Sequence, residues 1–201
     1  MSFYPADAAV PSGLRTADLL LEMLSPDHVE LDYEAVMESQ EQLRRFSNGS
    51  WPAPDFTLAE NLKDLEDHAR EFRDREAFTY TVLNHDRNRC EGCVYIYPWQ
   101  ATLSHRDVDA SIEDVNLADN EATVTFWIRD SGLERDLDRQ LVAGLLEWFD
   151  REWAFSRVTF MTNDNMPRQL EILAEVGCET RYVFDSVTGN TRWYFVSRPS
   201  R

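Results

Sequence analysis

The chain has 201 residues, and 43% of them are hydrophobic, which is enough apolar material for the core of one globular domain. Its 37 acidic and 20 basic residues give a formal net charge of −17 at pH 7. This charge opposes the phosphates of nucleic acids and of anionic membranes, so neither nucleic acid nor membrane is expected as a partner. The sequence also lacks an apolar run of ~20 residues and a signal-peptide pattern at its start, so a cytoplasmic location is expected.

The sequence pattern assigns residues 1–17 to an N-terminal extension and residues 18–201 to a single domain. An apolar run at residues 19–24 predicts the first strand. It ends at Ser25, which can cap a helix with Pro26 in its first turn. The next segment is compatible with a helix up to Phe46, and the Gly, Ser and Pro residues of SNGSWPAP end that helix.

The clearest helix signal follows in the segment DFTLAENLKDLEDHAREF. Thr57 and Glu60 have the spacing of a capping box, and apolar residues recur after them at steps of four and three. Two runs with strand character come next, AFTYTVL and GCVYIYPW, separated by the polar segment NHDRNR. This arrangement predicts an antiparallel hairpin.

After a polar insertion at residues 104–120, the alternating segment ATVTFWI predicts another strand, and an amphipathic helix is expected to begin near Ser131. RVTFM predicts a further strand, and NMPRQLEILAEVG a helix that ends at Gly177. TRYVF and TRWYFV predict a last pair of strands. The expected fold class is α/β, with a mixed, mostly antiparallel sheet of about seven strands flanked by about four helices.

Cys90 and Cys93 form a single C-x-x-C motif, and no second pair completes a tetrahedral zinc site. A redox or metal role would need ligands from distant segments. Residues three apart on a regular strand point to opposite faces, so the two thiols could converge only through a bulge at Gly92. We therefore expect both cysteines to be reduced and no metal to be bound.

The order of these elements, together with the segments EAFTYTVL, GCVYIYP, TFWIRD and NMPRQLEILAEVGC, resembles the GNAT superfamily of acyl-CoA-dependent N-acyltransferases. The resemblance covers residues 18 to 197. In that family the pantetheine arm of acetyl-CoA pairs with the backbone of the fourth strand, where the fourth and fifth strands diverge. The pyrophosphate binds at the N-terminus of the next helix.

The resemblance thus implies acetyl-CoA as co-substrate and assigns its binding to a continuous stretch of the chain and to the end of the next strand. The implied residues are Phe126, Trp127, Ile128, Gly132, Leu133, Glu134, Arg135, Asp136, Leu137, Asp138, Asn163 and Asn165.

The phosphate-binding loop departs from the family pattern. Leu133 stands where Gln or Arg is usual, and Asp136 and Asp138 stand where the family has Gly and then Gly or Ala. At an effective dielectric constant of about 20, two unit charges 4 Å apart interact by ~4 kcal/mol, so these carboxylates oppose diphosphate and acetyl-CoA binding is expected to be weak or absent.

Two interpretations of this acidic loop remain open. In the structural one, Ser131 and Glu134 form a capping box and the other acids interact with the helix dipole. In the functional one, the loop amides still bind the cofactor, with Asp136 and Asp138 turned outward. Compensating charge would then come from one of three arginines, Arg129, Arg135 or Arg139.

The catalytic residues are also unusual. Leu173 stands where many family members have the tyrosine that protonates the departing thiolate, and Met166 replaces a nearby asparagine. Glu121 at the start of the fourth strand is a candidate general base, although a solvated acid at a strand end explains it too. Tyr182 is a hydroxyl-bearing candidate that could equally be a core aromatic.

Two functions are compatible with these observations. The first is an N-acetyltransferase that transfers an acetyl group from acetyl-CoA to an amine of a small molecule, for which a homodimer is an allowed assembly. The second is a catalytically inactive or repurposed GNAT-fold protein that binds another ligand or a partner in the same cleft.

Overall fold

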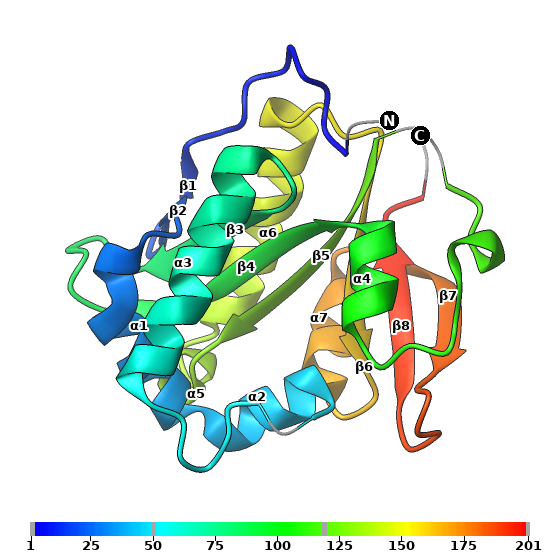
Figure 1. Ribbon diagram of the computed structural model, residues 1–201. Coiled ribbons are helices and arrows are strands. Elements are labelled where there is room, and N and C mark those ends of the chain that lie inside the picture. The colour runs from blue at the N-terminus through cyan, green and yellow to red at the C-terminus, as the bar shows by residue number, and fades with distance from the viewer. Residues whose placement is uncertain (1–2, 50, 118–119, 200–201) are drawn as a thin grey trace.

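The computed structural model describes residues 3–49, 51–117 and 120–199 (Figure 1). Its centre is one eight-stranded sheet with the order β1-β2-β3-β4-β5-β6-β8-β7. Strands β5 and β6 are parallel, and the other neighbours are antiparallel. The strands are β1 (Gly13–Arg15), β2 (Leu20–Met23), β3 (Phe78–Leu83), β4 (Cys90–Pro98), β5 (Glu121–Ile128), β6 (Arg157–Asn163), β7 (Glu179–Asp185) and β8 (Arg192–Ser197).

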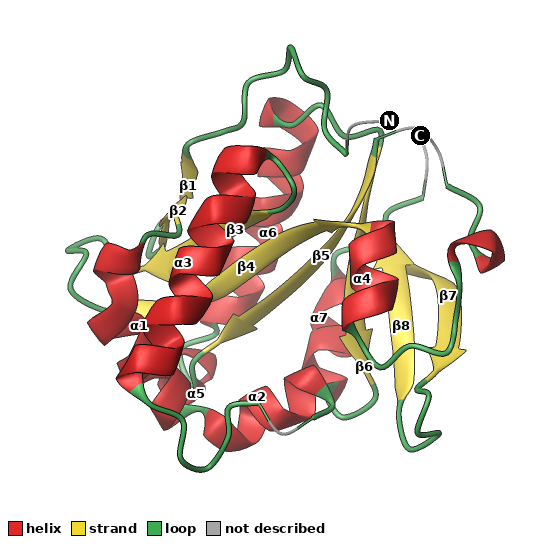
Figure 2. Ribbon diagram, viewed as in Figure 1, coloured by secondary structure: helices red, strands yellow, loops and turns green. Residues whose placement is uncertain are grey.

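Helices cover both faces of the sheet (Figure 2). Those on the face turned to the viewer in Figure 1 include α3 and α4, and α6 lies behind the sheet. The helices are α1 (Val29–Glu38), α2 (Gln40–Ser47), α3 (Leu58–Asp74), α4 (Trp99–His105), α5 (Asp130–Leu133), α6 (Leu137–Glu152) and α7 (Pro167–Glu175), with short 3-10 turns at Pro26–His28 and Ile112–Asp114. Within the described ranges, no helix combines the length and apolar character needed to cross a bilayer.

The alternation of β5 separates the two sides of the core. Its even-numbered residues, such as Val124 and Phe126, pack with Leu141 of α6 and Leu173 of α7 in the largest hydrophobic cluster. Trp127, on the opposite face, packs in a second cluster with residues of α1 and α3. The α/β class and the mixed sheet are therefore as expected.

Several boundaries differ from the expected ones. The expected N-terminal extension contributes β1, which pairs with β2, and its Tyr4 is buried in the main core. The short helix α4 begins at Trp99, where a strand was expected to end, and the polar insertion that follows it contains the 3-10 turn at Ile112–Asp114. The single helix expected up to Phe46 is two helices, because the chain breaks at Ser39, whose buried hydroxyl accepts a hydrogen bond from the Asp130 amide at 3.0 Å.

One of the two capping boxes that the sequence predicts is present in the structure, and the other is absent. At Thr57 the box is formed: its Oγ1 accepts from the Glu60 amide at 3.2 Å, and Glu60 Oε2 accepts from the Thr57 amide at 2.8 Å. The expected box of Ser131 and Glu134 is wrong. The chain there forms the four-residue helix α5, and the long helix α6 begins only at Leu137.

Candidate functional site

The strands β5 and β6 diverge, as the resemblance implied. Their pairing runs from Glu121 opposite Arg157 to Val124 opposite Phe160 and stops there. Beyond this point the carbonyl oxygens of Phe126 and Ile128 accept hydrogen bonds from side chains instead of from β6. The register of β5 against β4 is uninterrupted over this stretch, so the divergence needs no bulge in β5.

Two glutamine side chains donate hydrogen bonds to the β5 carbonyls where β5 and β6 diverge. Gln169 of α7 donates through Nε2 to the Phe126 carbonyl at 2.8 Å, and its Oε1 accepts from the Thr162 hydroxyl of β6 at 2.7 Å. Gln42 of α2 donates to the Ile128 carbonyl at 3.0 Å. Both glutamines are buried. The backbone acceptors that would pair with a pantetheine arm are therefore bound by the protein's own amides.

A cavity of about 280 Å³ lies beside this gap, on the face of the sheet that carries α6. Its wall is largely apolar, and its charged lining residues include Asp138 and Arg168. The residues around it include Phe126, Ile128, Leu133, Asp138, Asn165, Met166, Pro167 and Arg168. Such a slot suits an uncharged chain better than a diphosphate.

The acidic loop at the start of α6 is neutralised by Arg168 of α7. Asp138 is buried and forms a bidentate pair with this guanidinium, with Nε to Oδ2 at 2.5 Å and Nη2 to Oδ1 at 2.9 Å. Asp136 Oδ1 contacts the same Nη2 at 2.7 Å. Hydrogen bonds to Asp138 and then to Asp136 raise the pKa of Arg168 further above its usual value. The expectation that both carboxylates point outward is thus wrong for Asp138.

Asp136 nevertheless has the backbone conformation expected of the family's glycine. Its φ of 55° and ψ of 29° lie in the left-handed region, which Gly adopts freely and which Asp tolerates better than most residues. This conformation supports the alignment of Asp136 with the family's first glycine position.

The three arginines considered for phosphate binding are engaged elsewhere. Arg129 is buried and pairs with Glu34 and Glu38 of α1. Arg135 pairs with the buried Glu91 at 2.6 Å.

Arg139 contacts Glu175 of α7. Arg168, which the sequence interpretation missed, is the cation that binds Asp136 and Asp138.

Two backbone amides of this loop also donate hydrogen bonds to side chains of the α1–α2 corner. The Asp130 amide donates to Ser39 Oγ at 3.0 Å, and the Ser131 amide donates to Glu38 Oε1 at 3.1 Å. The hydrogen bond from Arg129 is the main cause that lowers the pKa of Glu38 to about 2. Contacts from the α1–α2 corner thus fix the loop in place of a local cap.

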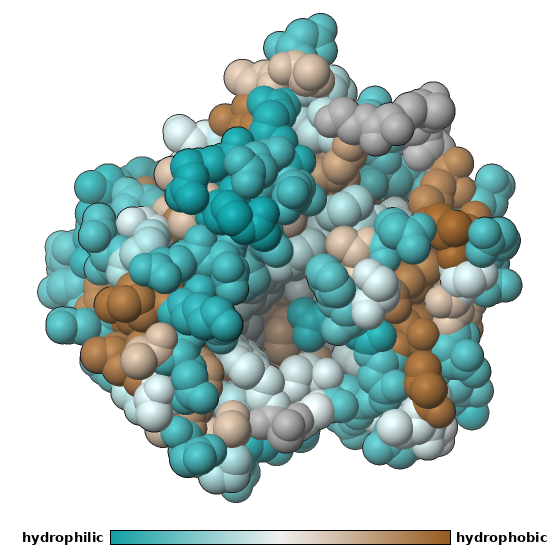
Figure 3. Space-filling view, in the orientation of Figure 1, coloured by the Kyte–Doolittle hydropathy of each residue, from teal (hydrophilic) through white to brown (hydrophobic). Residues whose placement is uncertain are grey.

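A larger cavity of about 490 Å³ opens on the opposite face of the sheet. Figure 3 shows this hollow between α3 and α4, above α2. Thr123 and Thr125 of β5 line this cavity, next to the point where β5 diverges from β6. Its ionisable residues are Asp32, Asp64, His68, Cys93, Tyr95, Tyr97, His105 and Arg106. Two cavities therefore meet β5 from opposite faces near the same point.

His68 is held by a carboxylate on the wall of the larger cavity. Its Nδ1 lies 3.1 Å from Glu71 Oε2, one helical turn further along α3, and 3.3 Å from the hydroxyl of Tyr97. The hydrogen bond from His68 is the main reason that the pKa of Glu71 is lowered. When Nδ1–H donates to Glu71, Nε2 is left as a proton acceptor.

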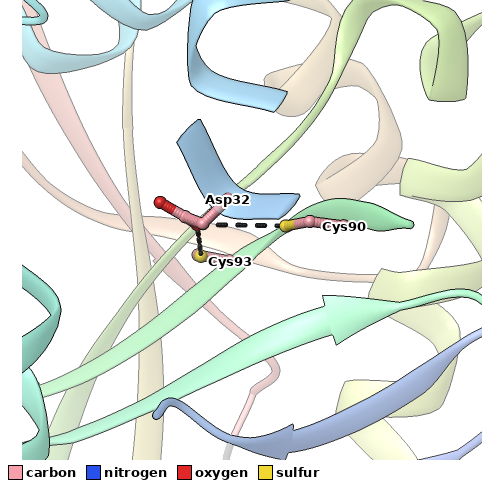
Figure 4. A group of neighbouring side chains, drawn as sticks. All are labelled: Asp32, Cys90 and Cys93. Carbon is pink, nitrogen blue, oxygen red and sulfur yellow. Dashed lines mark hydrogen bonds between the residues drawn. The ribbon is translucent and has the colours of Figure 1, made fainter. Parts of the chain in front are cut away.

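Figure 4 shows a cluster formed by Asp32 of α1 with the two cysteines of β4. Asp32 Oδ1 lies 3.3 Å from Cys93 Sγ and 3.9 Å from Cys90 Sγ, and its Oδ2 accepts from Asn61 at 3.0 Å. Burial raises the pKa of Asp32, and the contact with Cys90 is the main cause that raises the pKa of the Cys93 thiol. All three side chains are buried.

The expectation that the thiols point to opposite faces is wrong, because the register between β3 and β4 shifts next to Gly92. Only glycine fits there, since a Cβ would lie 1.9 Å from the Trp127 carbonyl oxygen. The cysteines are free thiols, and their metal-free state remains a prediction.

Neither expected catalytic residue lies on the two cavities. Glu121, at the start of β5, binds Arg157 at 2.5 Å and Arg181 at 3.1 Å. The Tyr182 hydroxyl accepts from the Asn116 amide at 2.9 Å, near the sheet edge formed by β7. Their catalytic roles remain predictions.

Of the two asparagines, Asn165 lines the smaller cavity. Asn163 ties β6 to α2 through hydrogen bonds of 3.1 Å to the carbonyls of Arg45 and Phe46. Leu173 is buried in the core, so no hydroxyl replaces the usual acid at that position.

Comparison with solved structures shows close agreement of fold at low sequence identity. A ribosomal L7/L12 alpha-N-protein acetyltransferase has a TM-score of 0.69 at 12% identity, over 98% of this chain and 98% of that chain. A microcin C7 self-immunity acetyltransferase in complex with acetyl-CoA and AMP has a TM-score of 0.71 at 11% identity, over 95% and 98%. A GNAT-family acetyltransferase from Bacillus anthracis has a TM-score of 0.66 at 9% identity, over 92% and 96%.

No protein-family model matches the sequence, and no curated protein matches it. The structural agreement covers nearly the whole chain, so the chain has the GNAT fold.

Proposed function

We propose that this protein is an N-acetyltransferase that uses acetyl-CoA as acyl donor and an amine of a small molecule as acceptor. The observation that carries the proposal is the pair of cavities that reach β5 from opposite faces where it leaves β6. Acyl transfer needs donor and acceptor to meet at one point from separate sides. Acetyl-CoA is bound in one structural neighbour, and coenzyme A in another.

The donor side is the cavity of about 280 Å³. A pantetheine arm there would exchange its own amide hydrogen bonds for those of Gln169 and Gln42 with β5. The diphosphate would meet Asp136 and Asp138, with Arg168 as the compensating cation. Donor binding is therefore expected to be weak compared with a glycine-lined loop.

The acceptor side is the cavity of about 490 Å³, with His68 as the proposed general base. The neutral amine attacks the thioester carbonyl, a C–N bond forms, and the C–S bond breaks as the thiolate leaves. His68 Nε2 removes the proton from the amine, directly or through one water, and the thiolate takes up a proton on release. Glu71 is a positioning residue that holds Nδ1.

The test is a free-thiol assay with acetyl-CoA and a panel of small amines, run on the parent, on His68→Gln and on His85→Gln. His85 is the matched control, because it lies outside the cavity lining and contacts the Thr16 carbonyl. Loss of a general base lowers the rate by about 10²–10⁴-fold, so His68→Gln should lose most of its activity and His85→Gln should keep it. Equal activity of the two variants would remove His68 from the mechanism.

The second candidate function is binding without catalysis. The buried Asp138–Arg168 pair and the Gln169 bridge favour it, because both occupy positions that the cofactor needs. Calorimetric titration of the parent with acetyl-CoA separates the two functions. Absence of binding at millimolar acetyl-CoA would support the second and refute the first.

A further inference from the structure

We propose that the acceptor carries an oxyanion, a carboxylate or a phosphate, and that Arg106 binds it in the larger cavity. This inference rests on the proposed function, since it concerns the acceptor of the same reaction. It narrows the acceptor from any small amine to an anionic amine with its two charged groups at separate ends.

Arg106 follows α4 directly and lines the cavity. Its guanidinium lies over the ring of Phe46, 5.2 Å from the ring centroid, and burial lowers the pKa of Arg106. Between its guanidinium and the other residues that the structure describes, there is no hydrogen bond or ion pair. An arginine stacked on a ring in this way keeps its N–H donors available for a ligand.

Unlike Arg106, other arginines near the sheet form ion pairs with carboxylates. Arg129 and Arg168 each bind two carboxylates. Arg181 binds Glu121. A chain with a net charge of −17 has ample acids to neutralise Arg106 as well. Arg106 is half-buried, so its guanidinium is still accessible from the cavity, and the lack of an ion-pair partner among the described residues indicates a site completed by an external anion.

The acidic groups at the larger cavity lie on α1 and α3, away from Arg106. Asp64 and the His68–Glu71 pair lie on α3, and Asp32 lies on α1. Arg106 is on the side of α4, beside His105. An acceptor can therefore place its ammonium toward α3, where His68 removes the proton, and its oxyanion toward Arg106. The opposed charges fix the orientation of such a molecule in a way that a neutral amine cannot match.

The experiment compares acceptors that differ in one group. L-phenylalanine and phenethylamine differ by a carboxylate, and phosphoethanolamine and ethanolamine differ by a phosphate. Each pair is assayed with the parent, with Arg106→Gln, and with Arg73→Gln, an exposed arginine of α3 that serves as the matched control. Hydrogen bonds to charged groups correspond to about 10- to 100-fold in kcat/KM.

We expect the parent to prefer the anionic member of at least one pair, and the pair shows whether the group is a carboxylate or a phosphate. Arg106→Gln should lose this preference mainly through a higher KM for the anionic acceptor, whereas Arg73→Gln should keep it. Its Tm should change little, because the half-buried guanidinium forms no hydrogen bond or ion pair with the described residues. A preference for the neutral amines in the parent, or an anionic preference that survives in Arg106→Gln, would overturn the proposal.

The proposed function can fail separately. If no amine is acetylated, calorimetry with phosphoethanolamine and with L-phenylalanine tests Arg106 directly. Binding to the parent that Arg106→Gln loses and Arg73→Gln keeps would support the anion site without catalysis. Absence of binding of both compounds to the parent would overturn it.

Discussion

Replacement of Asp138 by Asn is the sharpest test of the phosphate end of the donor site. Asp138 is buried, with 2% of its side chain exposed, and holds Arg168 through two hydrogen bonds. Asn has the same shape and can still accept from Arg168, but it carries no charge. The change leaves Asp136 and Arg168 as a neutral pair at the position where the diphosphate would bind.

The expected effect on acetyl-CoA affinity follows from Coulomb's law. A carboxylate ~6 Å from a phosphate charge costs ~3 kcal/mol at an effective dielectric constant of ~20. Salt and movement of Arg168 reduce this value, and we expect at least ~1.4 kcal/mol, or tenfold tighter binding. Loss of a charge-assisted hydrogen bond should lower the free energy of unfolding by ~1.5–3 kcal/mol.

The assay is calorimetric titration with acetyl-CoA at low salt, with urea unfolding as a parallel measurement. Glu134→Gln is the matched control, because it removes one negative charge from an exposed position in the same loop. Its affinity should change by less than that of Asp138→Asn. If both variants bind acetyl-CoA as the parent does, the loop does not contact the diphosphate, and the placement of the cofactor is wrong.

Three further predictions concern single positions. Asp136→Gly should be at least as stable as Asp136→Ala in urea unfolding, because the left-handed backbone at φ 55° favours glycine. Gly92→Ala should lose several kcal/mol or fail to fold, since its Cβ would lie 1.9 Å from the Trp127 carbonyl oxygen; thermal unfolding measures this. The Glu38–Arg129 ion pair should stabilise the fold fully above pH 4.5 and lose its effect as the pH falls to about 2, because the pKa of Glu38 is lowered in the fold. The stability difference between the parent and Glu38→Gln should therefore shrink over that pH range.

Local signals in the sequence predicted the elements that local contacts determine. The capping box of Thr57 and Glu60 and the alternation of β5 were confirmed, because each depends on residues close in sequence. The box of Ser131 and Glu134 failed for the opposite reason. Its amide donors are bound by residues of the α1–α2 corner, more than ninety positions earlier, and no local pattern reveals such partners.

The candidate site was predictable only in part. The divergence of β5 from β6 followed from the resemblance, whereas the left-handed conformation of Asp136 was not predicted. The pair His68 and Glu71 had a visible signal, since a spacing of three on a helix places both side chains on one face. Arg168 had none, because only the packing of α7 against α6 brings it to the loop.

The short parallel pairing between β5 and β6 has a consequence for how the molecule opens. Residues 157–197, which form β6, α7, β7 and β8, share only four aligned residue pairs with the rest of the sheet, and side-chain contacts, among them Arg181 with Glu121 and Arg168 with Asp138, make the other connections. Because so few backbone hydrogen bonds cross between β5 and β6, this segment can separate from β5 without loss of its own antiparallel hydrogen bonds. Native-state amide exchange should therefore show this C-terminal portion as a cooperative unit that opens at lower free energy than β3 and β4.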